Sequence, residues 1–466
     1  MDFLQRIRCF DRIVVSIISV SRNRAKIGLN INNDTHSFVL EYKYDHDVDL
    51  NSNLAGLMGA TAVINYALFT GEMVFNFPTS PADRKMIREM VEINNVEVFV
   101  NRLCRIRYNF FKKEYLPTDQ EITESNARGD TRLTFREDFQ DHYEKAAGGR
   151  AAVMLSGGKE SLLTFGIMKE IDQKTIPYFF NESGGHWKAA KHSHDVLSRE
   201  GESARVWSNI DRFYNFMNHL MPVLDPVVSF SWADDYPVQL FLFPVYIFAV
   251  LPSASSLSIG HILMGNELDD PAEEPPYRGI KHYYGVYDQS SDFQGRFSEY
   301  LMEKGFGITL WSALYNIYGS VVEDILVKRY PSLYKLQRSC HSCRYVEGDV
   351  YPCGKCSKCL GVRLFIAYAK GNPEEIHYPG SEKLAEETRK ERMKLDPDEL
   401  QFLLDGLESG QYHEGTQVTG IHILPNEKEP MEKIPASYRN SIMKIISYYT
   451  TGVWKLENGH WIMVKK

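Results

Sequence analysis

The pattern of apolar and polar positions predicts a small β-sheet at the start of the chain. Apolar and polar residues alternate over residues 12–17, 25–31 and 36–42. A period of two is typical of strands that bury one face, so we expect three antiparallel strands here. The turn signal Asn-Asn-Asp at residues 32–34 separates the second strand from the third.

The pattern then changes to a helical period. Apolar positions three and four residues apart predict helices over 53–69 and 81–94, and Ser80, which lies directly before a proline, predicts the cap of the second helix. The stretch 117–132 is polar and irregular, and we expect a linker there. Together these elements predict an N-terminal α+β domain over residues 1–145.

Strand and helix patterns alternate through the middle of the chain. They fall at 151–155, 161–171, 175–180, 187–200 and 203–207. Residues 258–264 predict a further strand, and the apolar stretch 236–249 predicts a buried helix. This alternation is typical of the α/β class, with a parallel sheet and helices on both of its faces. We expect this core domain over residues 146–370, with its ligands at the carboxyl ends of the strands.

The last part of the chain, residues 371–466, predicts a small C-terminal extension. Residues 397–404 have a helical pattern. Residues 452–456 and 460–464 alternate on either side of Asn458-Gly459, and that arrangement predicts a terminal hairpin.

Composition and charge limit the partners of the protein. The formal net charge of the 466 residues is −8, so no overall positive field attracts a nucleic-acid backbone. The longest apolar stretch, from Val238 to Leu251, is interrupted by Pro244 and is shorter than a membrane span. Free thiols without a secretory signal indicate a reducing compartment. We therefore expect a cytoplasmic protein with no membrane or nucleic-acid partner.

A glycine-containing loop directly follows the strand predicted at 151–155. It consists of Ser156, Gly157, Gly158, Lys159, Glu160 and Ser161. Glycines allow the backbone to approach an anion closely, and the start of the next helix supplies N–H groups and a positive dipole end. The serine hydroxyls and the lysine charge suit a di- or triphosphate. An ordinary strand–helix turn is the alternative, and the spacing is not that of a Walker A motif.

Five of the seven cysteines fall in one short segment. They are Cys340, Cys343, Cys353, Cys356 and Cys359. The last three are separated by two residues each, so a tight turn can direct their thiolates at one tetrahedral centre. Either Cys340 or Cys343 supplies the fourth ligand. Such sites usually hold a structural Zn²⁺ ion, and an iron–sulfur cluster is the alternative.

The loop resembles the SGGxDS pyrophosphate loop of the ATP pyrophosphatase (PP-loop) superfamily, with Glu160 where that family usually has Asp. The loop and the later C…CGxCxxC segment together resemble the 7-cyano-7-deazaguanine synthase (QueC) family and its relatives. The resemblance covers roughly residues 148–370. It implies an adenine nucleotide alpha hydrolase-like core.

The resemblance also implies an activity. Enzymes of that family adenylate the carboxylate of 7-carboxy-7-deazaguanine with ATP, release pyrophosphate, and let an amine attack to give an amide. In the nitrile-forming members a second adenylation dehydrates this amide to a nitrile. The implied cofactors are ATP, Mg²⁺ and Zn²⁺. The amine is either ammonia or an amine of a protein, as in the QueC-like proteins of antiphage operons, which also have long flanking segments.

Site residues follow from the same resemblance. The catalytic residues would be Lys159, Glu160 and Ser161. The ATP-binding residues would be Ser156, Gly157, Gly158, Lys159, Ser161 and Asn181. The substrate-binding residues would be His186, Asn266, Glu267, Tyr287, Asp288 and Gln289. The Mg²⁺ ligand would be Glu160, Glu267, Asp269 or Asp270. The metal-binding residues would be Cys340, Cys353, Cys356 and Cys359, because the Ser-Cys-His run at 339–341 favours Cys340 over Cys343.

The chain also departs from the family. The family's Pro-x-Arg-Asn sequence is Pro237-Val238-Gln239-Leu240 here, so an arginine that serves the nucleotide is missing. The segment from Asn53 to Ala60 resembles the UDP-N-acetylmuramoyl-L-alanyl-L-glutamate epimerase family, which also activates a carboxylate with ATP. Such an epimerase, or a nucleotide-binding module without turnover, is the alternative function.

Overall fold

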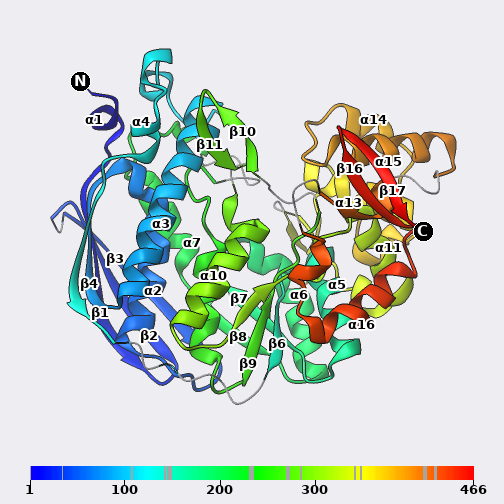
Figure 1. The fold of residues 1–466 in the computed structure, drawn as a ribbon, viewed down its shortest axis with the longest axis horizontal. Coiled ribbons are helices and arrows are strands. Elements are labelled where there is room, and N and C mark those ends of the chain that lie inside the picture. The colour runs from blue at the N-terminus through cyan, green and yellow to red at the C-terminus, as the bar shows by residue number, and fades with distance from the viewer. Residues whose placement is uncertain are drawn as a thin grey trace.

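The computed structural model has an α/β fold built on one large mixed sheet flanked by helices (Figure 1). The ten strands of this sheet follow the order β12-β9-β6-β7-β8-β3-β2-β1-β4-β5. The structure describes residues 2–33, 35–105, 109–140, 143, 149–229, 236–268, 273–283, 286–340, 343–346, 349–412, 417–424 and 428–466. Across these residues, no helix combines the length and the apolar character that crossing a membrane requires.

The N-terminal part of the sheet begins with the antiparallel strands that the sequence predicts. β1 (Phe10–Ser21), β2 (Arg24–Ile31) and β3 (His36–Tyr44) pair in this way. β4 (Thr70–Thr79) and β5 (Arg132–Asp138) then add in parallel beyond β1. The local pattern does not predict these two strands, because their partners are distant in the sequence.

The core part of the sheet is parallel, as predicted. β12 (Thr309–Trp311), β9 (Ile259–Leu263), β6 (Arg150–Met154), β7 (Ile176–Asn181) and β8 (Ala204–Ser208) lie side by side in this order. The chain runs from β6 to β7 and β8 on one side and then returns to β9 and β12 on the other. The strand order therefore reverses between β6 and β9. In open parallel sheets, ligands bind at such a reversal, beyond the carboxyl ends of the strands.

One antiparallel pairing joins the two parts of the sheet. Tyr42 of β3 lies opposite Ser208 of β8, and Tyr44 lies opposite Val206. The sheet therefore contains strands from both sides of the domain boundary that the sequence predicts between residues 145 and 146. The boundary itself stays a prediction.

Helices and smaller strands surround the sheet. The helices are α1 (Phe3–Ile7), α2 (Ser52–Val63), α3 (Pro81–Val98), α4 (Glu124–Arg128), α5 (Lys159–Ile171), α6 (Gly185–Glu200), α7 (Ile210–His219), α8 (Pro226–Ser229), α9 (Phe243–Val250), α10 (Ser291–Glu303), α11 (Gly319–Arg329), α12 (Pro331–Tyr334), α13 (Ser357–Ala369), α14 (Leu384–Arg389), α15 (Pro397–Ser409) and α16 (Ala436–Ser447). The smaller strands are β10 (Glu273–Tyr277), β11 (Ile280–Tyr283), β13 (Arg344–Val346), β14 (Asp349–Tyr351), β15 (Ile421–Ile423), β16 (Val453–Glu457) and β17 (His460–Lys465).

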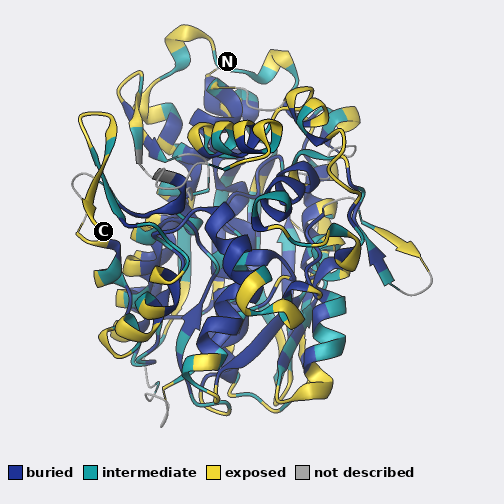
Figure 2. Cartoon of the chain, turned by 90° about the vertical axis from the view of Figure 1, so that its right-hand side faces the viewer, coloured by how far each residue is buried: buried dark blue, intermediate teal, exposed yellow. Residues whose placement is uncertain are grey.

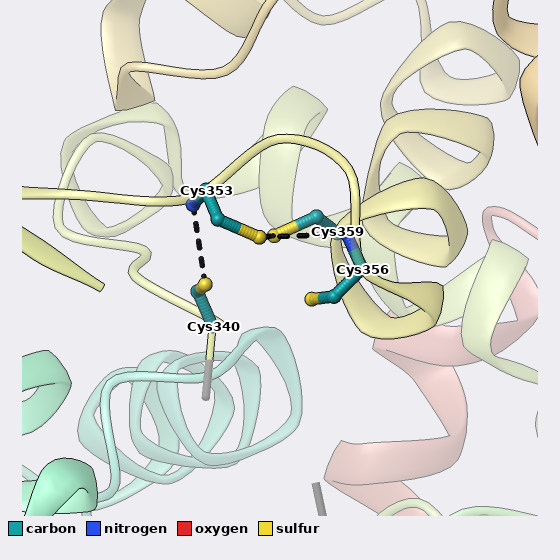
Figure 3. A group of neighbouring side chains, drawn as sticks. All are labelled: Cys340, Cys353, Cys356 and Cys359. Carbon is teal, nitrogen blue, oxygen red and sulfur yellow. Dashed lines mark hydrogen bonds between the residues drawn. The ribbon is translucent and has the colours of Figure 1, made fainter. Parts of the chain in front are cut away.

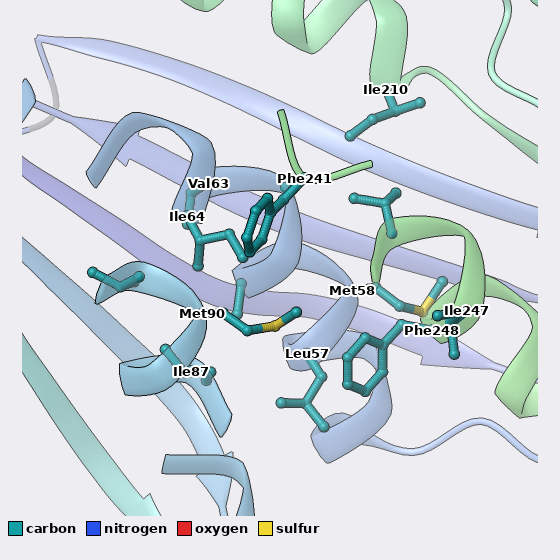
Figure 4. Close-up of a cluster of buried hydrophobic side chains, with 14 of the residues drawn as sticks. Leu57, Met58, Val63, Ile64, Ile87, Met90, Ile210, Phe241, Ile247 and Phe248 are labelled. Atoms are coloured by element: carbon teal, nitrogen blue, oxygen red, sulfur yellow. The ribbon is translucent and has the colours of Figure 1, made fainter. Parts of the chain in front are cut away.

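A buried apolar cluster connects α2, α3 and α9 on one face of the sheet (Figure 4). Its members include Leu57, Met58, Val63, Ile64, Ile87, Met90, Phe241, Ile247 and Phe248. Helix α2 is buried on all sides because it lies between the strands β1 and β4 and the helix α9. A second cluster packs α5, α11 and α13 against the core strands. Figure 2 shows the buried residues along the central strands and the exposed ones on the outer helices.

Two predicted helices have different bounds in the structure. Helix α2 ends at Val63, and residues 64–69 continue as a 3₁₀ helix. The predicted helix over 236–249 begins only at Phe243, as α9. Pro244 lies in its first turn, where a missing N–H and a fixed φ are tolerated best.

The C-terminal extension has the predicted helix and hairpin. α15 covers the predicted helical stretch, and β16 and β17 form the hairpin. Its turn residues Asn458 and Gly459 both have positive φ, as a tight hairpin turn requires. The extension also contains a parallel pairing of β15 with β16 that the sequence pattern does not predict.

A buried ion pair fixes α3 to α10. Ser80 caps α3 as predicted, in a capping box with Asp83. The same Asp83 carboxylate lies 2.9 Å from Lys304 Nζ, and both side chains are completely buried. It also accepts hydrogen bonds from Tyr300 Oη (2.6 Å) and Asn53 Nδ2 (2.7 Å). The pair is therefore well satisfied inside the core.

We expect Asp83→Ala to destabilise the protein by about 3–5 kcal/mol, because it leaves the Lys304 ammonium buried without a counter-charge. Asp138→Ala is the matched control: it also removes an aspartate from an ion pair, with Arg84, but its side chain is 93% exposed. The control change should cost at most about 1 kcal/mol. Urea denaturation measures both values, and equal costs would contradict the expected difference.

Candidate functional site

The loop at 156–158 connects β6 to α5 where the strand order reverses. Gly157 has a φ of 83°, a region that favours glycine, and a Cβ there would lie 2.9 Å from the carbonyl oxygen of Ala189. Gly158 is the N-cap residue of α5 and offers no side chain to cap it, and the Glu160 carboxylate interacts with the backbone N–H of Glu160 in the first turn. The first amides of α5 have no carbonyl partner within the helix, and the positive end of its dipole faces the loop.

Two hydroxyl groups close this turn. Ser156 Oγ and Ser161 Oγ lie 3.3 Å apart, and Ser161 Oγ donates to the carbonyl oxygen of Gly158 at 3.0 Å. The structure thus brings the predicted residues 156–161 together in one small turn.

Lys159 is held between two carboxylates. Its Nζ donates to Glu160 Oε1 at 2.7 Å and also to Glu267, and it lies 4.8 Å from the centre of the Phe365 ring. Burial opposes the lysine charge, but the two carboxylates raise the pKa of Lys159 well above its usual value. Burial also opposes the charge of Glu160, yet Lys159 and Lys358 lower the pKa of Glu160 to about 2. Both loop residues are therefore charged.

The segments after the neighbouring strands reach the loop to different extents. Glu267, beyond β9, contacts Lys159 directly. Asn181 ends β7, and its Oδ1 accepts from Ser183 N at 3.0 Å. His186 is half-buried, and burial together with the charge of Lys358 lowers its pKa to about 4. Asp269 and Asp270 lie outside the described residues.

The other predicted substrate residues make bonds within the fold. Asn266 is buried, and its Nδ2 donates to the carbonyl oxygen of Gln289 at 2.8 Å. Its Oδ1 accepts from Gln294 Nε2 at 2.5 Å. The Asn266 amide thereby connects the end of β9 to the turn that precedes α10.

Tyr287 and Asp288 are buried as well. Tyr287 Oη donates to Asp292 Oδ2 at 2.7 Å. Asp288 Oδ2 accepts from the backbone N–H groups of Leu242 (2.7 Å) and Phe243 (2.8 Å) at the start of α9. Burial raises the pKa of Asp288 to about 7. Asp288 thus positions α9, and a role for these residues in binding substrate stays a prediction.

Four of the five clustered cysteines come together in space (Figure 3). The sulfur atoms of Cys340, Cys353, Cys356 and Cys359 all lie within 4.8 Å of one another. The Sγ atoms of Cys353 and Cys359 are 3.7 Å apart. A tetrahedral site with metal–sulfur bonds of about 2.3 Å has sulfur–sulfur edges of about 3.8 Å. The four thiols could therefore hold a metal ion such as zinc.

Backbone groups support this arrangement. Cys353 N donates to Cys340 Sγ at 3.2 Å, and Cys356 N donates to Cys353 Sγ at 3.4 Å. Such bonds stabilise negative charge on sulfur. Cys343 Sγ instead donates to the carbonyl oxygen of Cys340 at 3.0 Å. The group that the structure assembles thus contains Cys340, as the resemblance favours, and not Cys343.

The cysteine segment packs directly on the glycine loop. Arg338 N donates to the carbonyl oxygen of Gly157 at 2.8 Å. Ser339 lies beside Gly158, and the ring of Phe365 lies against Lys159. A metal ion on the four thiols would therefore brace the loop.

Sequence reasoning missed several residues of this site. Lys358 and Phe365 are on α13, and Arg338 and Glu323 also surround the loop. Their only sequence signal is the position of Lys358 and Arg338 close to the cysteines. Glu323 is completely buried, and its burial raises its pKa to about 8, although Lys159 opposes this rise.

Comparison with known proteins adds no assignment: no protein-family model, curated protein or solved structure matches this chain.

We expect Cys340→Ser to abolish metal binding and to lower the melting temperature, because it removes one of the four clustered ligands. Cys343→Ser, the matched control, should retain the metal. Elemental analysis of the purified variants measures the metal content, with zinc as the expected element. Loss of metal from Cys343→Ser alone would reverse the ligand assignment.

We expect Glu323→Gln to reduce the loss of stability between pH 5 and pH 8. The folded protein keeps the Glu323 proton up to about pH 8, whereas the unfolded chain releases it near pH 4.5, so raising the pH favours unfolding. The difference between wild type and variant should reach about 4 kcal/mol by pH 8. Glu375→Gln, at a half-exposed residue, is the control. The measurement is the free energy of unfolding from urea denaturation at several pH values between 5 and 8. The same pH dependence of this free energy in wild type and Glu323→Gln would refute the expectation.

Proposed function

We propose that the loop at 156–161 binds the phosphates of ATP, and that the protein uses ATP to adenylate a carboxylate and transfer it to an amine. One observation carries this proposal: a helix start with glycine at its N-cap follows a close-packed glycine turn at the reversal of the strand order. This combination of amide donors and a positive dipole end suits phosphate oxygens. The Ser156 and Ser161 hydroxyls add further donors.

The charges around the loop support the same proposal. Glu160 and Glu267 both contact the Lys159 ammonium, so their carboxylates already converge on one cation. They therefore fit Mg²⁺ as ligands, and a bound Mg²⁺ ion would neutralise phosphate charge. Lys159 would then be available to the phosphates. Lys358, which interacts with both Glu160 and His186, supplies positive charge for an anionic substrate.

The proposed reaction has two steps. A carboxylate oxygen of the substrate attacks the α-phosphorus of ATP, and the bond to pyrophosphate breaks. An amine nitrogen then attacks the carbonyl carbon of the acyl-adenylate, AMP leaves, and the nitrogen loses a proton. Positioning by the loop and neutralisation of charge supply the rate enhancement. The four-thiolate centre, with zinc as the proposed ion, has no open position and acts only on structure.

The resemblance to the QueC family suggests 7-carboxy-7-deazaguanine as the substrate and either ammonia or a protein amine as the acceptor. The test is incubation with ATP, Mg²⁺ and this carboxylate, with and without ammonia, followed by mass spectrometry of small molecules and protein. AMP with an amide or nitrile supports the proposal. AMP with no incorporated nitrogen indicates an epimerase-like activity, and bound ATP without AMP indicates a binding module.

We expect Lys159→Ala to lower the rate of AMP formation about 100-fold or more, because it removes the cation nearest the proposed phosphate site. Ser161→Ala should also lower this rate, without removing a charge. Lys188→Ala, at an exposed lysine of α6, is the control and should leave the rate unchanged. Circular dichroism checks folding, and a wild-type rate in Lys159→Ala would rule out the proposed role of the loop.

A further inference from the structure

A small pocket lies at the carboxyl ends of β7 and β8. Its lining consists of Glu182, Ile210, Asp211, Tyr214, Tyr236, Leu242, Val245 and Tyr246. Two carboxyl groups and three tyrosine rings therefore face one space. None of these residues belongs to the predicted catalytic, ATP-binding, substrate-binding or metal-binding sets.

The backbone brings the two carboxyl groups together. Asp211 N donates to the carbonyl oxygen of Glu182 at 3.3 Å, which fixes the start of α7 against the end of β7. A Cβ at Gly184 would lie 2.7 Å from the carboxyl carbon of Asp211, so this carboxyl group packs on bare backbone. Glu182 Oε1 accepts from Trp187 N at 2.8 Å. The positions of both acids are therefore set by the main chain.

Glu182 has no basic side chain near it among the described residues except His186, and Arg212 is the cation that acts on Asp211. Glu182 is only 6% exposed, and buried carboxylates are normally paired with a cation or neutralised. The nearest basic side chain is His186, 3.8 Å away, and burial together with the Lys358 charge lowers its pKa to about 4, so it is neutral. Burial has the opposite effect on the acid, and it raises the pKa of Glu182 to about 7.

A second feature points to a ligand with hydrogen-bond donors or acceptors. Tyr214 lines the pocket and is 4% exposed, and its hydroxyl group has no hydrogen-bond partner within the described part of the chain. Leaving a buried hydroxyl unpaired costs free energy. The rings of Tyr214 and Tyr236 are 6.5 Å apart at an angle of 63°, so aromatic faces and edges surround the carboxyl groups.

The size of the pocket limits this ligand. The space is small, with room for about one water-sized group. A bicyclic base does not fit, but a protonated amine head does. Carboxylates and aromatic rings together are the groups that bind ammonium-type cations.

We propose that this pocket binds the protonated head of a primary amine, with Glu182 and Asp211 as the charged partners and the tyrosine rings as the walls. This inference goes beyond the proposed function, because binding requires no ATP. The Tyr236 ring lies 6.2 Å from the ring of His186. The charge of Lys358 acts on both His186 and the loop residue Glu160. If the proposed function holds, the pocket brings an amine acceptor close to the loop.

The test is titration of the full chain with methylammonium chloride, without ATP, by isothermal calorimetry at pH 8. This pH lies above the pKa of Glu182, so the carboxylate is charged. Wild type should bind methylammonium. It should not bind tetramethylammonium, which is too large for the pocket, and potassium chloride should give a weaker binding signal than methylammonium chloride. Glu182→Gln and Asp211→Asn should each weaken binding about tenfold or more.

Asp195→Asn is the matched control, since it removes one charge from the exposed side of α6 and leaves the pocket intact. It should bind methylammonium as wild type does. Circular dichroism checks the fold of each variant. If a pocket variant does not fold, the preference of wild type for methylammonium over tetramethylammonium remains as the test of the inference. Absence of methylammonium binding to wild type, equal binding of tetramethylammonium or potassium, or unchanged affinity in both pocket variants would overturn the inference. None of these outcomes depends on ATP turnover.

Discussion

The contact between the glycine loop and the cysteine segment is the constraint on which the site depends. The hydrogen bond from Arg338 N to the Gly157 carbonyl oxygen joins two segments that lie far apart in the sequence. Because Arg338 lies two residues before Cys340, the position of the four thiols sets the position of the loop wall. A glycine turn is flexible by itself. Packing against the cysteine-bearing segment gives it one conformation.

The charges around Lys159 are paired within the fold. Buried charges are tolerated only when they are paired, and Lys159 is paired with Glu160 and Glu267. An anion bound at the loop would compete with these carboxylates for the same ammonium. The Glu160 side chain reaches Lys159 Nζ from the next residue along the loop. Ion pairing and the proposed phosphate binding thus involve the same residues.

The N-terminal half supports the site through the sheet and through contacts such as the hydrogen bond from Tyr66 Oη to the Tyr214 carbonyl oxygen (3.4 Å). The pairing of β3 with β8 continues the core sheet into the N-terminal strands. The buried pair of Asp83 and Lys304 ties α3 to α10, and Asn266 ties the end of β9 to the turn before α10. Helix α9, whose start is held by Asp288, forms one wall of the acidic pocket. Asn266 and Asp288, which the sequence predicts as substrate-binding residues, therefore hold the end of β9, the turn before α10 and the start of α9 in place.

The sequence by itself determined the features that depend on near neighbours. Period-two and helical patterns located β1, β2, β3 and the alternating core elements, and the glycine loop and the cysteine spacing were visible as motifs. Only the tertiary structure decided what depends on distant contacts: the strands β4 and β5, the pairing of β3 with β8, and the meeting of Glu182 with Asp211. Local patterns report which face a segment buries, whereas partners across the fold are chosen by packing and charge.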